Sequence, residues 1–209
     1  MRNTLGIRDR TLLQQVEYVV AERVRDSIQT GEIPIEQTFD LAHARQLHTA
    51  LFTDLYPNWA GAVRPHGMHR GDHAFAQPNQ IEHYWRNATE VIRNADLPGI
   101  PRDEFVSTVT RVYANINQAH LGREGNGRTG KLFLDQVAEQ SPFKLDYSLV
   151  DQARWNEQSK RSRPETGYLA VRPAELVKVF DQITVYREKP ATDQTLPLSP
   201  VQQRALRPR

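Results

Sequence analysis

The segment from His120 to Lys131 limits the possible folds more than any other part of this chain, because it places a glycine-rich run between two helical patterns. Before it, residues 103–119 carry apolar side chains at three- and four-residue spacing, at Phe105, Val109, Val112 and Ile116. After it, residues 129–139 are expected to bury Leu132, Phe133, Val137 and Ala138. We therefore predict a helix, a glycine-rich loop and a second helix, with a site where the second helix begins.

The residue types in this loop suit the binding of an anion. Glycines such as Gly125 and Gly127 let backbone N–H groups approach a phosphate at a helix start. Glu124 beside them can hold Mg²⁺ across phosphate oxygens. His120 can accept a proton, because an unperturbed imidazole has a pKa of about 6.5. The sequence thus predicts a nucleotide-phosphate site with a general base next to it.

The same residues also fit part of a second phosphate-binding motif. Residues 125–131 satisfy Gly-x-x-x-x-Gly-Lys, but Leu132 stands where the P-loop needs a Ser or Thr for Mg²⁺. A P-loop also follows a buried strand, whereas residues 103–119 have the spacing of a helix. Both observations argue against a P-loop.

Composition indicates an ordinary globular chain. Its 209 residues are 38% hydrophobic and 25% charged, enough for one sizeable domain, expected over residues 1–188. The net charge of +2 is too small to argue for a nucleic-acid partner, and the absence of Cys excludes disulfides. No apolar stretch approaches the length of a membrane span, so we expect a cytoplasmic protein without a membrane segment. The proline-rich, polar residues 189–209 are expected to form a disordered tail or linker.

Apolar periodicity elsewhere predicts a mostly α-helical fold with one small β-hairpin. Helices are expected over residues 9–31, 40–57, 78–94, 145–161 and 173–186. Asp9 and Asp40 are suited to cap the first two. The expected apolar face of the first helix is Leu12, Val16, Val19, Val20, Val24 and Ile28. Short β-compatible runs around glycines place the hairpin within residues 62–76.

The loop resembles the signature of the Fic family, His-x-Phe-x-Asp/Glu-Gly-Asn-Gly-Arg-x-x-Arg. His120 and the run from Glu124 to Arg128 match it at the right spacing. Two positions depart from it, since Gly122 stands in place of the Phe and Lys131 in place of the second Arg. Trp59-Ala60-Gly61, followed by a hairpin that ends in Phe75-Ala76, is similar to the family's flap. The resemblance implies the mainly helical Fic fold.

The resemblance also implies a reaction, in which AMP moves from ATP to a Ser, Thr or Tyr hydroxyl of a target protein. His120 is then the general base. Glu124 is the ligand of Mg²⁺, which bridges the α- and β-phosphates. The implied phosphate-binding residues are Gly125, Asn126, Gly127, Arg128 and Lys131. ATP is thus the expected substrate and Mg²⁺ the expected cofactor.

The flap is implied to bind the target by main-chain pairing, with Met68, Arg70, Gly71 and Phe75 as docking residues. Histidines at 66, 69 and 73 are interpreted as solvated loop residues, because their spacing suits no common metal site. Many family members are restrained by a helix with Ser/Thr-x-x-x-Glu-Gly/Asn, and only residues 184–189 approach that pattern. A separate inhibitory protein, as in toxin–antitoxin pairs, or no restraint, fits this chain better. Delivery to a host cell as an effector is a further possibility.

The two departures leave alternatives open. A missing Phe at Gly122 removes a buried aromatic anchor, worth about 3–5 kcal/mol where the site does not collapse. Our hypothesis is that Leu121 fills the gap. Lys131 offers one compact charge where Arg offers a planar fork. Besides an adenylyltransferase, we therefore consider a phosphotransferase like the Doc toxins, which tend to have Lys where Gly127 stands, and a degenerate Fic fold acting as a binding module.

Overall fold

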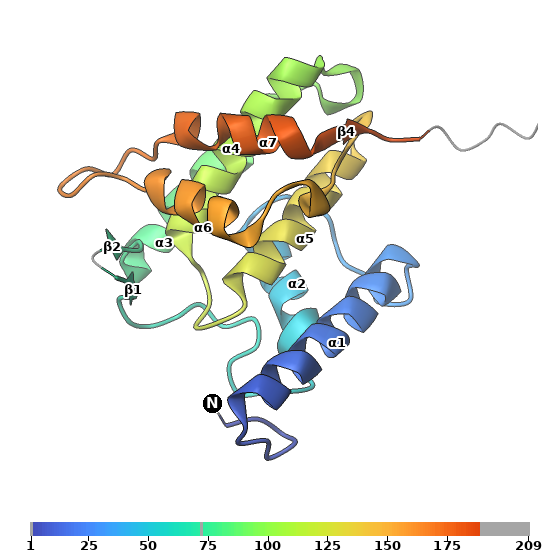
Figure 1. Ribbon diagram of the computed structural model, residues 1–209, viewed down its shortest axis with the longest axis vertical. Helices are drawn as coiled ribbons and strands as arrows, with labels where there is room; N and C mark the ends of the chain where they lie inside the picture. Colours follow the sequence, from blue (N-terminus) through green and yellow to red (C-terminus); the bar gives the residue numbers. More distant parts are fainter. Residues whose placement is uncertain (1, 72, 189–209) are drawn as a thin grey trace, which may run out of the picture.

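The computed structural model describes residues 2–71 and 73–188, which form a mainly helical fold with two small antiparallel sheets (Figure 1). The α-helices are α1 (Arg10–Gln29), α2 (Leu41–Phe52), α3 (Ile81–Arg93), α4 (Arg102–Ala119), α5 (Asn126–Glu139), α6 (Gln152–Arg161) and α7 (Val177–Ile183). The short 3₁₀ helices are Pro78–Gln80, Leu97–Gly99, Tyr147–Leu149 and Pro173–Leu176. The strands are β1 (His69–Arg70), β2 (His73–Ala74), β3 (Phe143–Leu145) and β4 (Thr184–Tyr186).

Helix α4 is the centre of the core and packs against α3, α5 and α7. Its predicted apolar residues are all buried, and Phe105, Val109 and Val112 are fully enclosed. The predicted apolar residues of α5 are buried too, among them Phe133 and Val137. Because α4 directly precedes the glycine-rich loop and α5 follows it, the loop is fixed at both ends to the most buried part of the fold. A helix in place of a strand before the loop also excludes the P-loop.

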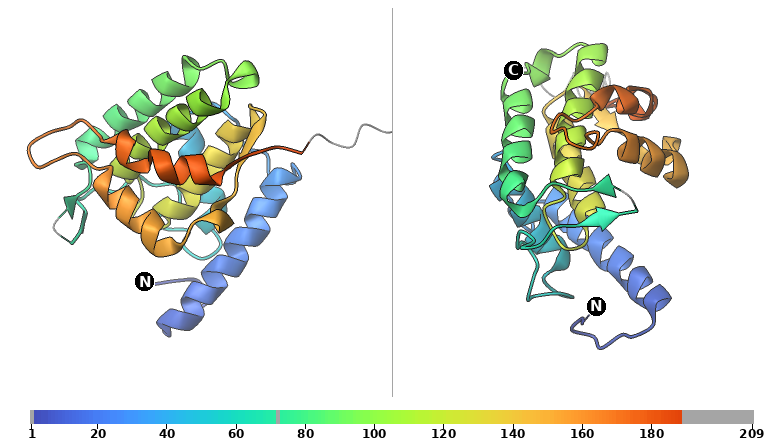
Figure 2. Two further views of the ribbon diagram at one scale, coloured as in Figure 1. Left: turned by 45° about the horizontal axis from the view of Figure 1, so that its top comes forward. Right: turned by 90° about the vertical axis from the view of Figure 1, so that its left-hand side faces the viewer.

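Helix α1 lies along one edge of the molecule, next to α2 (Figures 1 and 2). Asp9 caps it as expected, accepting a hydrogen bond from the Leu12 N–H at 2.7 Å. The predicted apolar face is wrong in part, because Leu12 is 48% and Val19 70% exposed. A helix at the rim meets its neighbours along a narrow strip, and the buried strip here is Leu13, Ala21, Val24 and Ile28.

The predicted hairpin is confirmed within residues 62–76. β1 and β2 pair antiparallel, with His69 opposite Ala74 and Arg70 opposite His73. The hairpin is short, and its position over the end of α4 is fixed by hydrogen bonds from the Ala76 N–H to the Gln118 carbonyl (3.0 Å) and from the Arg64 N–H to the Leu121 carbonyl (2.9 Å). The flap therefore lies against the glycine-rich loop, as expected if it holds a target next to the predicted phosphate site.

Two predicted helices are wrong at one end each. Residues 145–161 and 173–186 were expected to be helical throughout, but β3 includes Leu145 and pairs with β4 at the end of the second segment. In β3, Phe143 and Leu145 face inward and Lys144 faces solvent, an alternation that three residues are too few to reveal. Since β4 begins at Thr184, the described residues 184–188 do not form an inhibitory helix.

Within the described ranges, no helix is both long enough and apolar enough to cross a membrane. The predicted tail, residues 189–209, lies outside the described residues.

Candidate active site

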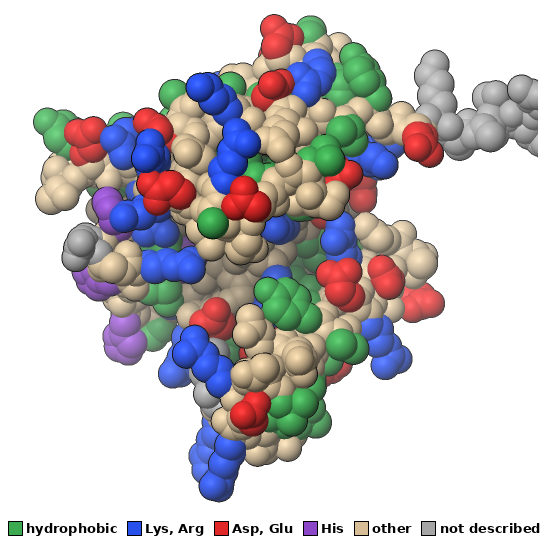
Figure 3. Space-filling view, viewed as in Figure 1, with side chains coloured by type: hydrophobic (Ala, Val, Ile, Leu, Met, Phe, Trp, Pro, Cys, Tyr) green, Lys and Arg blue, Asp and Glu red, His purple; other side chains and the backbone are tan. Residues whose placement is uncertain are grey.

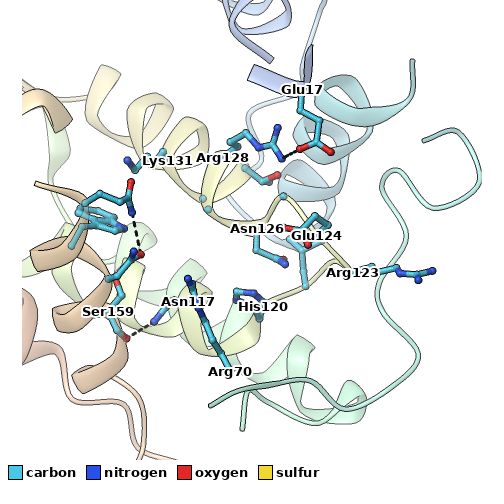
Figure 4. A pocket seen from close by; sticks show the side chains of 18 of the residues that line it. Glu17, Arg70, Asn117, His120, Arg123, Glu124, Asn126, Arg128, Lys131 and Ser159 are labelled. Atoms are coloured by element: carbon cyan, nitrogen blue, oxygen red, sulfur yellow. Dashed lines mark hydrogen bonds and ion pairs between the residues drawn. The ribbon is translucent and has the colours of Figure 1, made fainter. Parts of the chain in front are cut away.

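The loop between α4 and α5 turns the chain sharply and opens onto a cavity of about 1660 Å³ (Figure 4). His120 ends α4 in the left-handed conformation, with φ of 45°, and Gly125 begins α5 with φ of 78°. Every residue predicted to form the site lines this cavity, namely Met68, Arg70, Gly71, Phe75, His120, Glu124, Gly125, Asn126, Gly127, Arg128 and Lys131. The structure thus brings the predicted phosphate loop and the predicted flap together.

The loop is held rigid by side chains that pair with its backbone. The Asn126 amide accepts a hydrogen bond from the Gly122 N–H at 2.7 Å and donates one to the Gly122 carbonyl at 2.9 Å. Arg64, only 4% exposed, donates to the carbonyls of His120 (2.7 Å) and Ala119 (3.2 Å), and to that of Ala76. Asn126 therefore organises the loop from within, and Arg64 ties it to the flap.

His48 of α2 occupies the space beside Gly122, the position at which the Fic signature has Phe. A Cβ atom built at Gly122 would lie 2.6 Å from His48 Nε2 and 3.2 Å from the Glu124 carbonyl oxygen. His48 Nδ1 accepts a hydrogen bond from the Gly61 N–H at 2.8 Å, and Nε2 lies 3.0 Å from the same Glu124 carbonyl. The imidazole therefore carries its proton on Nε2 and bridges two backbone groups.

This arrangement changes our hypothesis about Leu121. Leu121 is buried, at 3% exposed, so it does contribute to the core below the loop. The His48 side chain, however, occupies the space that a side chain at Gly122 would need. Burial lowers the pKa of His48, and Arg128 lowers it further, so the ring stays neutral, as its two hydrogen bonds require.

Glycine is required at Gly125 for two reasons. Its φ is positive, and a Cβ there would lie 2.2 Å from Cζ of Phe52. A Cβ at Gly127 would instead meet nothing within 4 Å. The first turn of α5 is therefore packed on one side and open on the other, and its N–H groups, which have no partners within the helix, are free to bind an anion.

His120 is half-buried where α4 ends. Its ring stacks on Phe75, with 3.6 Å between ring centroids and 16° between planes. Burial lowers the pKa of His120 to about 3, and Arg163, Arg64 and Arg70 act in the same direction, whereas the Asn117 carbonyl near the ring opposes them. Nδ1 is buried and has no hydrogen bond of good geometry. At neutral pH the imidazole is therefore uncharged.

The two cations of α5 already have partners. Arg128 makes an ion pair with Glu17 of α1 at 2.8 Å, drawn as a dashed line in Figure 4, and its guanidinium lies 4.7 Å from the Phe52 ring centroid. The Lys131 ammonium lies 4.6 Å from the ring centroid of Tyr147 and 5.0 Å from that of Trp155. Burial lowers the pKa of Lys131. Both cations line the cavity, but neither extends freely into it.

Glu124 is the acid of the loop, and its environment fits the predicted magnesium site. Its side chain is exposed, and among the described residues it makes no hydrogen bond or ion pair. The described chain contains no cluster of three or more metal-binding side chains. A metal here would thus take one ligand from the protein and the rest from substrate and water, which is how Mg²⁺ binds at phosphates. The flap histidines also form no such cluster.

Several residues of the site carry no signal in the sequence. Glu17, His48, Arg64 and Arg163 reach the loop or its base from segments far away in the sequence. None of them belongs to a motif. Only the Gly122 departure pointed to a compensating residue, and the position expected for it was Leu121 rather than His48. Phe75, predicted as a docking residue of the flap, is 3% exposed, and its ring stacks on His120.

Comparison with known proteins agrees with this geometry. The Fic/DOC family model matches residues 38–138, which include α2, the flap and the loop. The chain is 31% identical over 186 residues to the probable protein adenylyltransferase y4lH of Sinorhizobium fredii, covering 86% of this chain and 91% of that protein. The chain belongs to the Fic/DOC family.

A second relative of this Fic protein is longer. The protein adenylyltransferase VbhT of Bartonella schoenbuchensis is 35% identical over 152 residues, which are 72% of this chain, and the match spans only 31% of VbhT. Among solved structures, the Fic domain of a Bep effector from Bartonella sp. AR 15-3 matches with a TM-score of 0.76 at 23% identity, over 88% of this chain and 87% of the other. BepC of Bartonella tribocorum, solved with bound AMPPNP, matches with a TM-score of 0.75 at 20% identity, over 90% and 93%. These structures establish the shared fold.

Proposed function

We propose that this Fic protein is a protein adenylyltransferase, which moves AMP from ATP to a hydroxyl group of a target protein. The observation that carries the proposal is the position of a neutral, half-buried His120 beside the open N-terminus of α5. A neutral imidazole is the form that accepts a proton, and free N–H groups are the form that binds phosphate. The named activity of VbhT and the bound AMPPNP of BepC support ATP as the nucleotide.

In this proposal His120 takes the proton of the acceptor hydroxyl through Nε2. Because Nδ1 is buried, we assign the ring's single proton to it, which leaves Nε2 as the atom that accepts the proton. The Phe75 ring fixes the plane of the imidazole, and Arg64 fixes the backbone of His120. Removing the proton as the oxygen attacks avoids a charged alcohol intermediate and lowers the barrier.

The phosphates would lie over the first turn of α5. N–H groups there, oriented by the Asn126 bonds to Gly122, would bind the negative charge that develops on the α-phosphate. Glu124 would hold Mg²⁺, which neutralises charge on the leaving pyrophosphate. Arg128 would reach a phosphate by sharing or leaving Glu17. Lys131, at the end of the cavity beside Tyr147 and Trp155, would bind the far phosphates as a single charge.

The target would bind along the flap. β1 and β2 are two residues long, and Met68, Arg70 and Gly71 line the cavity from this hairpin. Main-chain groups at the hairpin edge would pair with an extended target segment and bring its hydroxyl over His120. An antitoxin partner, a role as a secreted effector and a single domain over residues 1–188 stay predictions.

The test is mass spectrometry of a cytosolic extract incubated with the purified protein and Mg-ATP. The proposal expects a target that gains AMP, and no such product with His120→Ala. A matched control is His83→Ala, because His83 is an exposed histidine of α3 outside the cavity and should leave the product unchanged. A target that gains phosphate instead would favour the Doc-like phosphotransferase. Absence of both modification and Mg-ATP binding would favour a binding module.

A further inference from the structure

Arg163 is a buried cation without an acidic partner. It follows the C-terminal end of α6 and is 5% exposed. Its Nε and Nη1 atoms are buried without a hydrogen bond, and no ion pair involves it within residues 2–71 and 73–188. Burial, followed by the nearby Arg70, lowers the pKa of Arg163 to about 10, so the group stays charged at neutral pH. An unpaired buried charge is costly and is typical of functional sites.

The guanidinium of Arg163 packs on the flap residue that supports the general base. Its Cζ lies 4.0 Å from the Phe75 ring centroid, and the His120 ring centroid lies 3.6 Å from the same point. One face of a benzene ring has no room for both groups at these distances. Phe75 is therefore sandwiched, with Arg163 on one face and His120 on the other.

The charged groups around His120 are nearly all positive. Arg64 reaches it from the segment after α2, Arg70 from β1 and Arg163 from the end of α6. Figure 4 shows Arg70 extending into the cavity between Asn117 and His120. The acids that line the same cavity are Glu17, Glu22, Glu124 and Glu157.

Those acids do little to offset the cations. Glu17 is paired with Arg128 and Glu157 with Arg161. Neither Glu22 nor Glu124 is among the main influences on the His120 pKa, whereas all three arginines are. The local field therefore opposes a proton on the imidazole.

We propose that Arg163 is a positioning residue for His120, which clamps Phe75 against the imidazole and holds an uncompensated positive charge behind it to keep the base neutral. This role rests on the proposed function of His120. It explains why the fold tolerates a buried, unpaired guanidinium and why Phe75 is turned inward. An aliphatic side chain of similar length would support Phe75 equally well but supply no charge.

The test measures His120 directly by NMR of histidine-labelled full-length protein over a pH series, with His120→Gln to assign its signal. The charge lies about 8 Å from the imidazole, which at effective dielectric constants of 80 to 20 corresponds to roughly 0.4 to 1.5 pH units. Arg163→Met, which keeps the packing and removes the charge, should raise the His120 pKa by that amount. At pH 5 the protonated fraction of His120 should rise from about 1% to between about 2% and 24%. In Arg163→Lys, which keeps the positive charge, the His120 pKa should stay close to that of the parent protein.

An unchanged His120 midpoint in a folded Arg163→Met protein would overturn the proposal, and so would an equal rise in Arg163→Lys. If Arg163→Met does not fold, Arg163→Gln provides the same neutral comparison. The measurement needs no target and no nucleotide, so its result is independent of whether the protein is an adenylyltransferase. Where the transferase reaction is observed, Arg163→Met should shift the acid limb of the pH profile of kcat/KM to higher pH. Loss of packing alone would not produce this shift.

Discussion

Gly122→Ala should destabilise this protein although it adds one methyl group. The new Cβ would lie 2.6 Å from His48 Nε2 and 3.2 Å from the Glu124 carbonyl, and both atoms belong to one hydrogen bond. Overpacking of this kind costs about 1–3 kcal/mol. For a domain of this size, each kcal/mol lowers Tm by about 2–4 °C. We expect a loss of roughly 2–12 °C in thermal unfolding followed by circular dichroism.

Gly127→Ala is the matched control for stability, since a Cβ there meets nothing within 4 Å and the residue lies in the first turn of α5. It should leave Tm unchanged or raise it slightly, because Ala favours a helix over Gly by up to about 1 kcal/mol. The comparison separates crowding at His48 from any general effect of replacing a loop glycine.

A double-mutant cycle with His48→Ala tests the cause. His48→Ala alone leaves the Gly61 N–H and the Glu124 carbonyl without their partner, at about 1–3 kcal/mol for each buried group. In that background the methyl group of Gly122→Ala has space, so its cost should fall by at least about 1 kcal/mol. Equal costs in both backgrounds, or a Gly122→Ala protein that unfolds at the parental temperature, would refute our account of how the loop is anchored.

Three further predictions concern charge. Binding of Mg-AMPPNP should raise the His120 pKa, because phosphate charge favours the imidazolium, and an NMR titration that shows no rise would place the phosphates elsewhere. Glu17→Gln should tighten Mg-AMPPNP binding several-fold in calorimetry, since Arg128 is released, while an unchanged Kd would mean that Arg128 does not contact phosphate. The pKa of His120 is near 3 in the folded state and near 6.5 in the unfolded state, so between these values the unfolded chain binds one more proton than the folded chain. The free energy of unfolding should therefore keep its full His120 contribution above pH 6.5 and decrease by up to about 1.4 kcal/mol per pH unit below it. Chemical denaturation of His120→Gln over the same pH range should show a smaller decrease.

The sequence predicted those parts of the molecule that depend on local pattern. The buried face of α4, the Asp9 and Asp40 caps and the hairpin over residues 62–76 are signals carried by neighbouring residues. The site was predictable for the same reason, since Glu124 to Arg128 form one continuous run. Three-residue strands such as β3 and β4 are too short for a period, and their pairing joins segments about forty residues apart.

The supporting residues escaped prediction because nothing local distinguishes them. His48 lies in a helix with an ordinary apolar stripe, and its partner Glu124 is 76 positions away. Glu17 is one polar residue on a surface helix until the fold places it 2.8 Å from Arg128. Gly122 was informative only because it lacks the Phe side chain that the Fic signature has at this position. A missing side chain predicts that another one fills the space, but only the fold shows which.

The cations of the site connect nucleotide binding to the strength of the base. Lys and Arg side chains border the hollow on the face shown in Figure 3, although the whole chain carries a net charge of only +2. Without an anion, Arg64, Arg70 and Arg163 act together with burial to hold His120 at a pKa of about 3, too low for an efficient general base at neutral pH. Phosphates bound at α5 would offset that field and raise the basicity of the same imidazole. The base would therefore gain strength only when a nucleotide is in place, so that proton removal from a target hydroxyl is coupled to the presence of the group it attacks.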